Sequence, residues 1–421
     1  MAVSATLSAE DAALARLVRR ESGLIVAQLQ RRLGDFDVAE ESVQEAISIA
    51  LLSWRRDGIP SNPAAWLALT ARRRAIDLLR KRSREQRLVD SLGADPTTAE
   101  LATTELSSAA GPSPATADER LPMLFGCCHP ALAVEARLAL TLRAVVGMRT
   151  SDIARAFLVP EPTVAQRLVR AKRKITNARI PFTVPEDDDL APRLDDVLTV
   201  IYLAYNAGYL DPSRAGQEMT DDAIWLAELV ARALPDQAEA WGLLSLLTFL
   251  WSRTAARFDD QQKLILLQDQ DRSRWDEVAI SRADGYLATA ASLRRTGRFQ
   301  LQAAIAGCHA SAASWAETDW LQIVTLYDML LMLDRSPVVR LNHAIALGHV
   351  AGPDAALAEV DQLTERLADY HLLHATRAEL LTQLGDPAAA RLANERALAL
   401  TSNPVEQELL RSRLAAEIDA Q

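Results

Sequence analysis

The sequence predicts an all-α protein in which two small helical domains, the second a helix-turn-helix, precede a tetratricopeptide-like helical-repeat domain. Three observations lead to this prediction. Ala and Leu abound while aromatic residues make up only 5% of the chain, which favours helices over sheets. Apolar residues recur at helical spacing along most of the 421 residues. Two segments with the composition of linkers divide a chain that is too long for one hydrophobic core.

The two linkers set the expected domain boundaries. The first helical domain covers residues 8–84, and the Ala-, Ser-, Thr-, Pro- and Gly-rich segment 85–118 follows as a flexible linker. The second helical domain covers residues 119–180. A stretch with three prolines and four acidic residues, "IPFTVPEDDDLAPR", predicts a second linker at 181–193. Residues 194–421 then form the helical-repeat extension.

Charge is distributed unevenly along the chain. Residues 1–180 carry 26 Lys and Arg against 20 Asp and Glu, a net charge of +6, whereas residues 181–421 carry 20 against 36, a net charge of −16. A basic part joined to an acidic part is typical of a polyanion-binding region fused to a region that avoids nucleic acid.

The pattern over residues 150–177 predicts a helix-turn-helix. Thr150 is the expected N-cap of a helix that begins at Ser151, and the turn 158–161 ends that helix. Pro162 suits the first turn of the second helix, where a missing N–H costs nothing. The second helix carries one apolar stripe, formed by Val164, Leu168, Ala171 and Ile175.

The opposite face of that second helix is cationic and rich in hydrogen-bond donors. It presents Thr163, Gln166, Arg167, Arg170 and Lys174, which have the donors to contact base edges. Lys172 and Arg173 suit phosphate contacts. A solvated cationic face is the alternative, but the turn and the stripe together favour DNA binding.

A second basic helix is expected over residues 63–84. Leu67, Ala71, Ala75 and Leu78 form its buried stripe, and its cations include Arg72, Arg73 and Arg74, followed by Arg80, Lys81 and Arg82. So many cations exceed what packing alone requires, which predicts a second nucleic-acid contact. Trp66 fits stacking on a base and burial in the core equally well.

An acidic amphipathic helix precedes the basic one. In "FDVAEESVQEAISIALLSW" the inward positions are Val43, Ile47, Ala50 and Trp54. The outer face is expected to carry Glu40, Glu41, Gln44 and Glu45. Such a face either meets solvent or docks a basic partner, and the sequence leaves both open.

An internal repeat lies near the C-terminus. Ala344, Leu347 and Ala356 recur 34 residues later as Ala378, Leu381 and Ala390, and Gly352 and Gly385 mark the turn within each unit. This period with small residues at helix crossings is typical of tetratricopeptide helix pairs. Chance similarity between Ala- and Leu-rich helices is the alternative.

Taken in order, these segments resemble the extracytoplasmic-function class of sigma factors. The segment 39–46 is similar to the helix of that class that docks on the polymerase clamp, 66–80 to its minus-ten helix, and 151–175 to its minus-thirty-five reader. The segments "LPMLFGCCHPAL", "LQDQDRSRWD" and "YHLLHATRAELL" resemble landmarks of a subgroup with a tetratricopeptide-like extension. The resemblance implies an alternative sigma factor whose partners are core RNA polymerase, promoter DNA and a protein regulator of the extension.

We expect no enzymatic activity, cofactor or metal site. His371 and His374 lack a third ligand at a diagnostic spacing, and the adjacent pair Cys127 and Cys128 lacks the second half of a zinc site. The chain contains no Gly-rich phosphate loop and no nucleophile elbow. The absence of a signal peptide, of a membrane-spanning apolar run and of a disulfide framework predicts a cytoplasmic protein without a membrane partner.

One alternative comes from another functional class. A stand-alone transcriptional regulator would also combine a helix-turn-helix with a tetratricopeptide-like sensing domain. It would need neither the acidic helix nor the second basic helix before residue 84, which favours the sigma factor.

Overall fold

The computed structural model describes residues 9–89, 120–157 and 159–419. Within these ranges the regular structure is helical, apart from an isolated antiparallel bridge between Phe258 and Leu264. The prediction of an all-α protein is therefore confirmed. The chain divides into two compact units, Met1–Leu203 and Ala204–Gln421.

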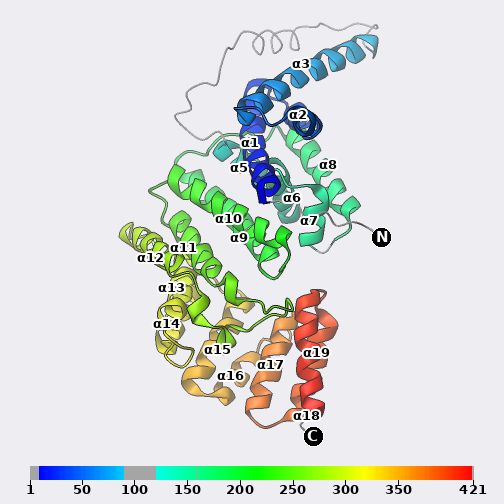
Figure 1. Ribbon diagram of the computed structural model, residues 1–421. Helices are drawn as coiled ribbons and strands as arrows, with labels where there is room; N and C mark the ends of the chain where they lie inside the picture. The colour runs from blue at the N-terminus through cyan, green and yellow to red at the C-terminus, as the bar shows by residue number, and fades with distance from the viewer. Residues whose placement is uncertain (1–8, 90–119, 158, 420–421) are drawn as a thin grey trace. The chain divides into compact units, whose positions relative to one another are not determined.

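The first unit holds the helices drawn from blue to green in Figure 1. They are α1 (Ala9–Leu33), α2 (Phe36–Asp57), α3 (Pro63–Val89), α5 (Arg120–Cys127), α6 (Val134–Ala144), α7 (Thr150–Ala156), α8 (Glu161–Ala178) and the start of α9 (Leu190–Tyr209). Helices α1, α2 and α3 pack against one another, and α6 and α7 pack against α8. The two predicted small helical domains therefore form two local bundles within this unit.

The predicted apolar stripes form the core of the first bundle. In α2, Val43, Ala50 and Trp54 are buried, and in α3 Leu67, Ala71 and Ala75 are buried. Trp54 and Trp66 meet edge to face with their ring centroids 5.4 Å apart. Trp66, which is half-buried, therefore takes part in the packing between α2 and α3.

Both expected linkers differ in part from the structure. Helix α3 continues to Val89, past the expected boundary at 84, and the rest of the first linker (90–118) lies outside the described residues. The second linker is packed, because Arg193 Nη2 donates to the Phe125 carbonyl at 2.7 Å and Asp196 at the start of α9 forms an ion pair with Arg137. These contacts explain why the first turns of α9 belong to the first unit.

The second unit continues from α9 to the C-terminal helices. It contains α10 (Arg214–Ala233), α11 (Ala238–Ser252), α12 (Glu277–Ser292), α13 (Arg298–Ser311), α14 (Trp320–Leu333), α15 (Pro337–Ala351), α16 (Pro353–Asp361), α17 (His371–Gln383), α18 (Pro387–Leu400) and α19 (Pro404–Asp419). Helix α11 is apolar almost all round and packs against α10, α12 and α13. A helix of that composition is expected at the centre of a helical unit.

The 34-residue repeat corresponds to two helix pairs, α15 with α16 and α17 with α18. The four repeated alanines are buried: Ala344, Ala356, Ala378 and Ala390. Gly352 and Gly385 join the helices of each pair with φ angles of +90° and +79°, which glycine adopts without the strain of other residues. The repeat is therefore structural and not a chance similarity of composition.

The segment "LQDQDRSRWD" lies between α11 and α12 and is held by side chains that cap helix ends. Arg272 donates to the carbonyls of His309 and Ala312 at the end of α13. Asp276 caps the start of α12 by accepting from the Ala279 N–H at 2.9 Å. Because these contacts satisfy terminal backbone groups, the landmark has a structural role.

Candidate nucleic-acid interface

The predicted helix-turn-helix is formed by α7 and α8. Its boundaries differ slightly from the expectation: Thr150 is the first residue of α7 and not its N-cap, which is Arg149 without a side-chain capping bond. Helix α8 begins at Glu161, so that residue belongs to the helix and not to the turn, and Pro162 lies in the first turn as expected. Helix ends commonly shift by one residue in this way.

The two faces of α8 separate as predicted. The buried residues of this helix are Val164, Leu168, Ala171 and Ile175. The opposite face is exposed at Gln166, Arg170, Arg173 and Lys174 and half-buried at Thr163 and Arg167. The stripe anchors the helix while the donor-bearing side chains remain accessible, which is the geometry that insertion into a major groove requires.

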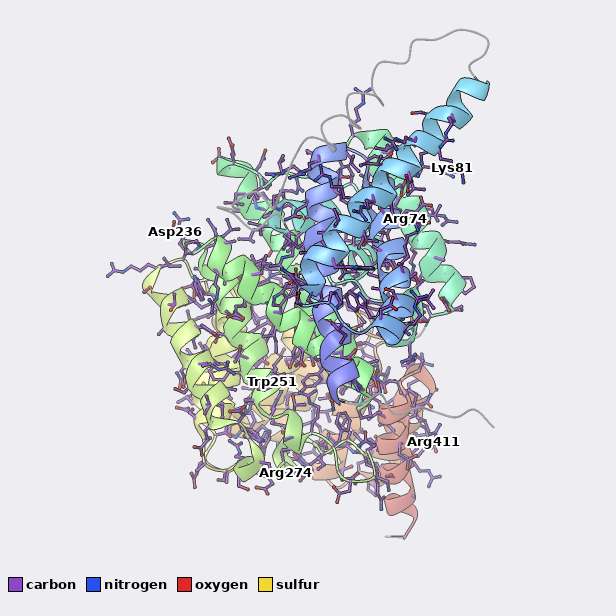
Figure 2. The ribbon with its side chains drawn as sticks, turned by 45° about the horizontal axis from the view of Figure 1, so that its top comes forward. Arg74, Lys81, Asp236, Trp251, Arg274 and Arg411 are labelled. Carbon is purple, nitrogen blue, oxygen red and sulfur yellow. The ribbon has the colours of Figure 1, made fainter. Side chains whose placement is uncertain are left out.

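The basic residues of α3 lie along a helix whose other side is buried in the first bundle. Arg73, Arg80, Lys81 and Arg82 are exposed, and Arg72 and Arg74 are half-buried. Figure 2 shows Arg74 and Lys81 along the accessible length of this helix. The structure therefore presents a cationic track on α3 at some distance in sequence from the helix-turn-helix.

The acidic side of α2 pairs with that basic helix. Glu45 lies 3.5 Å from the Arg74 guanidinium, and Glu41 lies 3.5 Å from that of Arg82. Gln44 is half-buried beside them. Exposed ion pairs of this kind contribute only about 0–1 kcal/mol, so both carboxylates remain available to another cationic partner.

Glu40 does not lie on the outer face as the sequence predicts. Its side chain is only 6% exposed; it accepts from Arg143 Nε at 3.0 Å and pairs with Lys172 of α8. The expectation was wrong because helical spacing identifies the face of α2 that is turned away from its own bundle but not whether another bundle covers it. Lys172, which was predicted to contact phosphate, instead forms this ion pair with Glu40. Its Nζ also lies 3.6 Å from Asp37 Oδ1.

Comparison with known proteins identifies these helices. Residues 17–85 match the family described as Sigma-70 region 2, and residues 123–175 match Sigma-70, region 4. The chain is a sigma factor similar to the extracytoplasmic-function class, with a C-terminal extension. Residues 193–291 of this sigma factor match a family of unknown function, DUF6596. An uncharacterized protein of Rhizobium meliloti (strain 1021) is 42% identical over 390 residues, which cover 92% of this chain and 91% of the relative.

These matches support a role as an alternative sigma factor, a class that binds core RNA polymerase and promoter DNA. The minus-thirty-five resemblance falls on α7 and α8, and the minus-ten resemblance falls on α3. Among the described residues, no helix has an apolar stretch long enough to cross a membrane.

The extension of the sigma factor contains a cavity that sequence analysis did not find. It has a volume of about 460 Å³ and lies between α15, α17 and α19. Its wall combines apolar residues such as Ile345 and Leu372 with the carboxylates Glu379 and Glu406. Its lining also includes Leu267 and Gln268 of the segment between α11 and α12, so residues far apart in the sequence meet there and neither segment alone predicts a cavity.

The histidines that were considered as metal ligands have other partners. His371 Nε2 lies 3.0 Å from Glu406 Oε2, and His374 Nε2 lies 2.9 Å from the Ala368 carbonyl oxygen. Burial alone would raise the pKa of Glu406, but hydrogen bonds from His371 and Thr401 hold it below its ordinary value. No group of three potential metal ligands occurs among the residues that the structure describes.

Cys127 and Cys128 lie at the C-terminal end of α5 with fully buried side chains. Burial raises the pKa of the Cys128 thiol to about 12 and also raises that of Cys127. Both side chains are protonated at neutral pH and act as small core residues, since a thiolate is the reactive and metal-binding form.

Proposed function

We propose that this sigma factor directs core RNA polymerase to its promoters through three surfaces of the first unit, and that the extension regulates it. Helix α8 reads the minus-thirty-five element, α3 contacts the melted minus-ten element, and α2 docks on polymerase. The observation that carries the proposal is the division of α8 into a buried apolar stripe and an accessible face with cationic and amide donors.

The accessible face of α8 supports contacts of two kinds. Gln166, Arg167 and Arg170 lie on its N-terminal half, which enters the groove first in a helix-turn-helix. Arginine donates two parallel hydrogen bonds to guanine, and glutamine does so to adenine. Thr163 precedes them. Lys172, Arg173 and Lys174 lie further along the helix and suit contacts with the phosphates of the DNA backbone.

Helix α3 supports a contact with opened DNA. Arg72, Arg73 and Arg74 are consecutive, so they spread around the helix and provide a cationic track rather than one base-reading face. Single-stranded DNA is held by such tracks together with stacking surfaces. This distinguishes the role of α3 from that of α8.

Helix α2 supports docking on a basic surface of polymerase. Glu41 and Glu45 are about half exposed, with side-chain exposures of 53% and 47%, and Gln44 lies between them. Their present partners are arginines of α3 in solvent, and such weak pairs can be exchanged at little cost. Glu40 can join this surface only when its contact with Lys172 and Arg143 is broken.

The extension supports regulation by a bound protein segment. Residues 181–421 carry a net charge of −16, which disfavours direct contact with DNA. Helical-repeat units commonly bind proteins along their inner helices, and α15, α17 and α19 line the cavity described above.

In vitro transcription with purified core polymerase tests the proposal. The full chain should support promoter-specific initiation and should co-purify with core polymerase. A chain ending at Leu203, where the first compact unit ends, should still bind core polymerase but should initiate with altered efficiency.

Two results would contradict the proposal. DNA binding without any effect on core polymerase would identify a stand-alone regulator instead. A folded shortened chain that transcribes as well as the full chain would rule out a role for the extension in initiation.

A further inference from the structure

We propose that the cavity of the extension is a binding site for an organic cation, an alkylguanidinium or alkylammonium group that belongs either to a basic side chain of the regulating protein segment or to a free small molecule. The inference deepens the proposed regulation by the extension and rests on that proposal only for the consequence of binding. It starts from the side chains that line the cavity between α15, α17 and α19, in the C-terminal part of the chain (Figure 1).

The cavity contains an ionised carboxylate with one oxygen that has no partner. Glu406, in the first turn of α19, is only 14% exposed. Its Oε2 accepts from Thr401 Oγ1 at 2.6 Å and lies 3.0 Å from His371 Nε2, whereas Oε1 accepts no hydrogen bond in the described part of the chain. Despite burial, the hydrogen bonds from His371 and Thr401 hold the pKa of Glu406 below its ordinary value, so the side chain is charged at neutral pH. A cation with N–H donors would supply the partner that Oε1 lacks.

A second carboxylate, that of Glu379 on α17, lines the same cavity and is weakly held. Its Oε2 lies 3.5 Å from Arg413 Nη2, and its Oε1 accepts from Gln383 Nε2 at 3.3 Å. Arg413 also lines the cavity, so two glutamates face one arginine there. The balance of charge favours a cation over an anion. The net charge of −16 over residues 181–421 adds a field that attracts cations to the extension.

Two aromatic rings of the cavity stand at nearly a right angle to each other. The ring planes of Trp315 and His349 enclose 80°, their centroids are 5.3 Å apart, and both residues line the cavity. Trp320 stacks on His349 with a centroid distance of 3.8 Å, and His309 stacks on Trp315 with a distance of 5.8 Å. These neighbours fix the corner that the two rings form. The face of an indole ring attracts alkylated ammonium and guanidinium groups.

The rest of the lining is mainly apolar and suits the alkyl part of such a ligand. Leu267 before α12, Leu372 on α17 and Leu409 on α19 contribute to it. The volume of about 460 Å³ and the few convergent polar groups are typical of sites for small ligands, whereas voids left by packing are rarely larger than a water molecule. A neutral apolar ligand would leave Glu406 Oε1 without a partner, so an alkylated cation fits the lining best.

Matched pairs of probes test the site on the full chain, by titration calorimetry at neutral pH. Pentylguanidinium is compared with pentylurea, which has the same shape without the charge, and acetyl-arginine methylamide is compared with acetyl-citrulline methylamide. We expect millimolar or tighter binding of the guanidinium probes. The ureas should bind at least about tenfold more weakly, because they lose the attraction between two close charges. Tighter binding of the arginine derivative than of pentylguanidinium would identify a protein segment as the source of the cation, and the reverse order a free small molecule.

Substitutions in the lining should change this preference in stated directions. Glu406→Gln should bind guanidinium and urea about equally. Glu408→Gln is the matched control, since it removes a carboxylate from the same helix at a position that is 53% exposed and outside the cavity lining. Trp315→Leu should weaken guanidinium binding by about 2-fold to 30-fold, and Trp315→Phe should retain more of the affinity. Arg413→Gln should strengthen it by up to about fivefold, because Glu379 loses its competing partner.

Two sets of results would overturn the cation site: absent or equal binding of guanidinium and urea by the parent, or an unchanged preference in Glu406→Gln. If circular dichroism shows that Glu406→Gln does not fold, Trp315→Leu and Arg413→Gln decide the question, because they should change the affinity in opposite directions. These measurements contain no polymerase, so their failure leaves the proposed function intact. A parent that does not bind core polymerase would overturn the proposed function and leave the cation site in place.

Discussion

Replacing Arg167 or Arg170 by Ala should separate promoter recognition from folding. Neither guanidinium forms an ion pair or hydrogen bond within the described part of the chain, and the buried stripe of α8 is untouched by either change. Surface changes of this kind alter stability by about 0.5 kcal/mol or less. If each arginine reads a base, its removal should cost about 1–3 kcal/mol, which weakens promoter binding roughly 5-fold to 150-fold.

The assay is promoter binding by the variant reconstituted with core polymerase, measured at several salt concentrations. Loss of a base contact weakens binding most for the preferred sequence, whereas loss of a phosphate contact weakens all sequences and lowers the salt dependence by about one ion. Arg155→Ala is the control, since that exposed arginine of α7 pairs with Asp152 beside it. Parental promoter binding and transcription by both variants would refute the assignment of α8.

Three other predictions concern separate parts of the chain. Combined replacement of Arg72, Arg73 and Arg74 by Ala should leave polymerase binding intact but reduce promoter opening in permanganate footprints; equal opening would mean that this side of α3 is only solvated surface. Gly352→Ala should cost about 1 kcal/mol, because φ is +90° there, and should lower the Tm of the second unit by about 2–4 °C, whereas Gly285→Ala should not. Burial lowers the pKa of His309 from 6.5 to about 4, so the unfolded chain binds more protons between these values and stability should fall by up to about 3 kcal/mol as pH falls from 6.5 to 4. His309→Gln should lose this part of the acid sensitivity in melts recorded across that range.

Local sequence patterns predicted most of the burial and exposure of side chains within single helices. The stripe on α8 is buried, the basic side of α3 is accessible, and the 34-residue repeat forms two helix pairs. Each of these features depends on residues a few positions apart, for which helical periodicity is decisive. The predicted N-cap of α7, Thr150, lies one residue after the observed N-cap, Arg149. A threonine side chain is acceptable both at the N-cap and in the first turn, so the sequence could not separate the two positions.

Contacts between distant helices could not be predicted in the same way. Nothing near Glu40 in the sequence indicates that Arg143 and Lys172 will cover it, since both lie more than one hundred residues away. The packing of Arg193 and Asp196 on the first unit was missed for the same reason, because the prolines and acidic residues before them suggested a linker. The cavity of the extension likewise forms only when α15, α17 and α19 meet the segment that precedes α12.

The ion pair between Lys172 and Glu40 constrains which residues of α8 can change independently. A change at Gln166 or Arg170 alters only an exposed side chain, so selection or design can vary these positions freely to obtain new specificities. A change at Lys172 also leaves the buried carboxylate of Glu40 with one cation fewer, and a compensating change on α2 would then alter the surface assigned to polymerase. Positions 40 and 172 should therefore vary together among relatives that retain the contact, while Gln166 and Arg170 diverge independently of both.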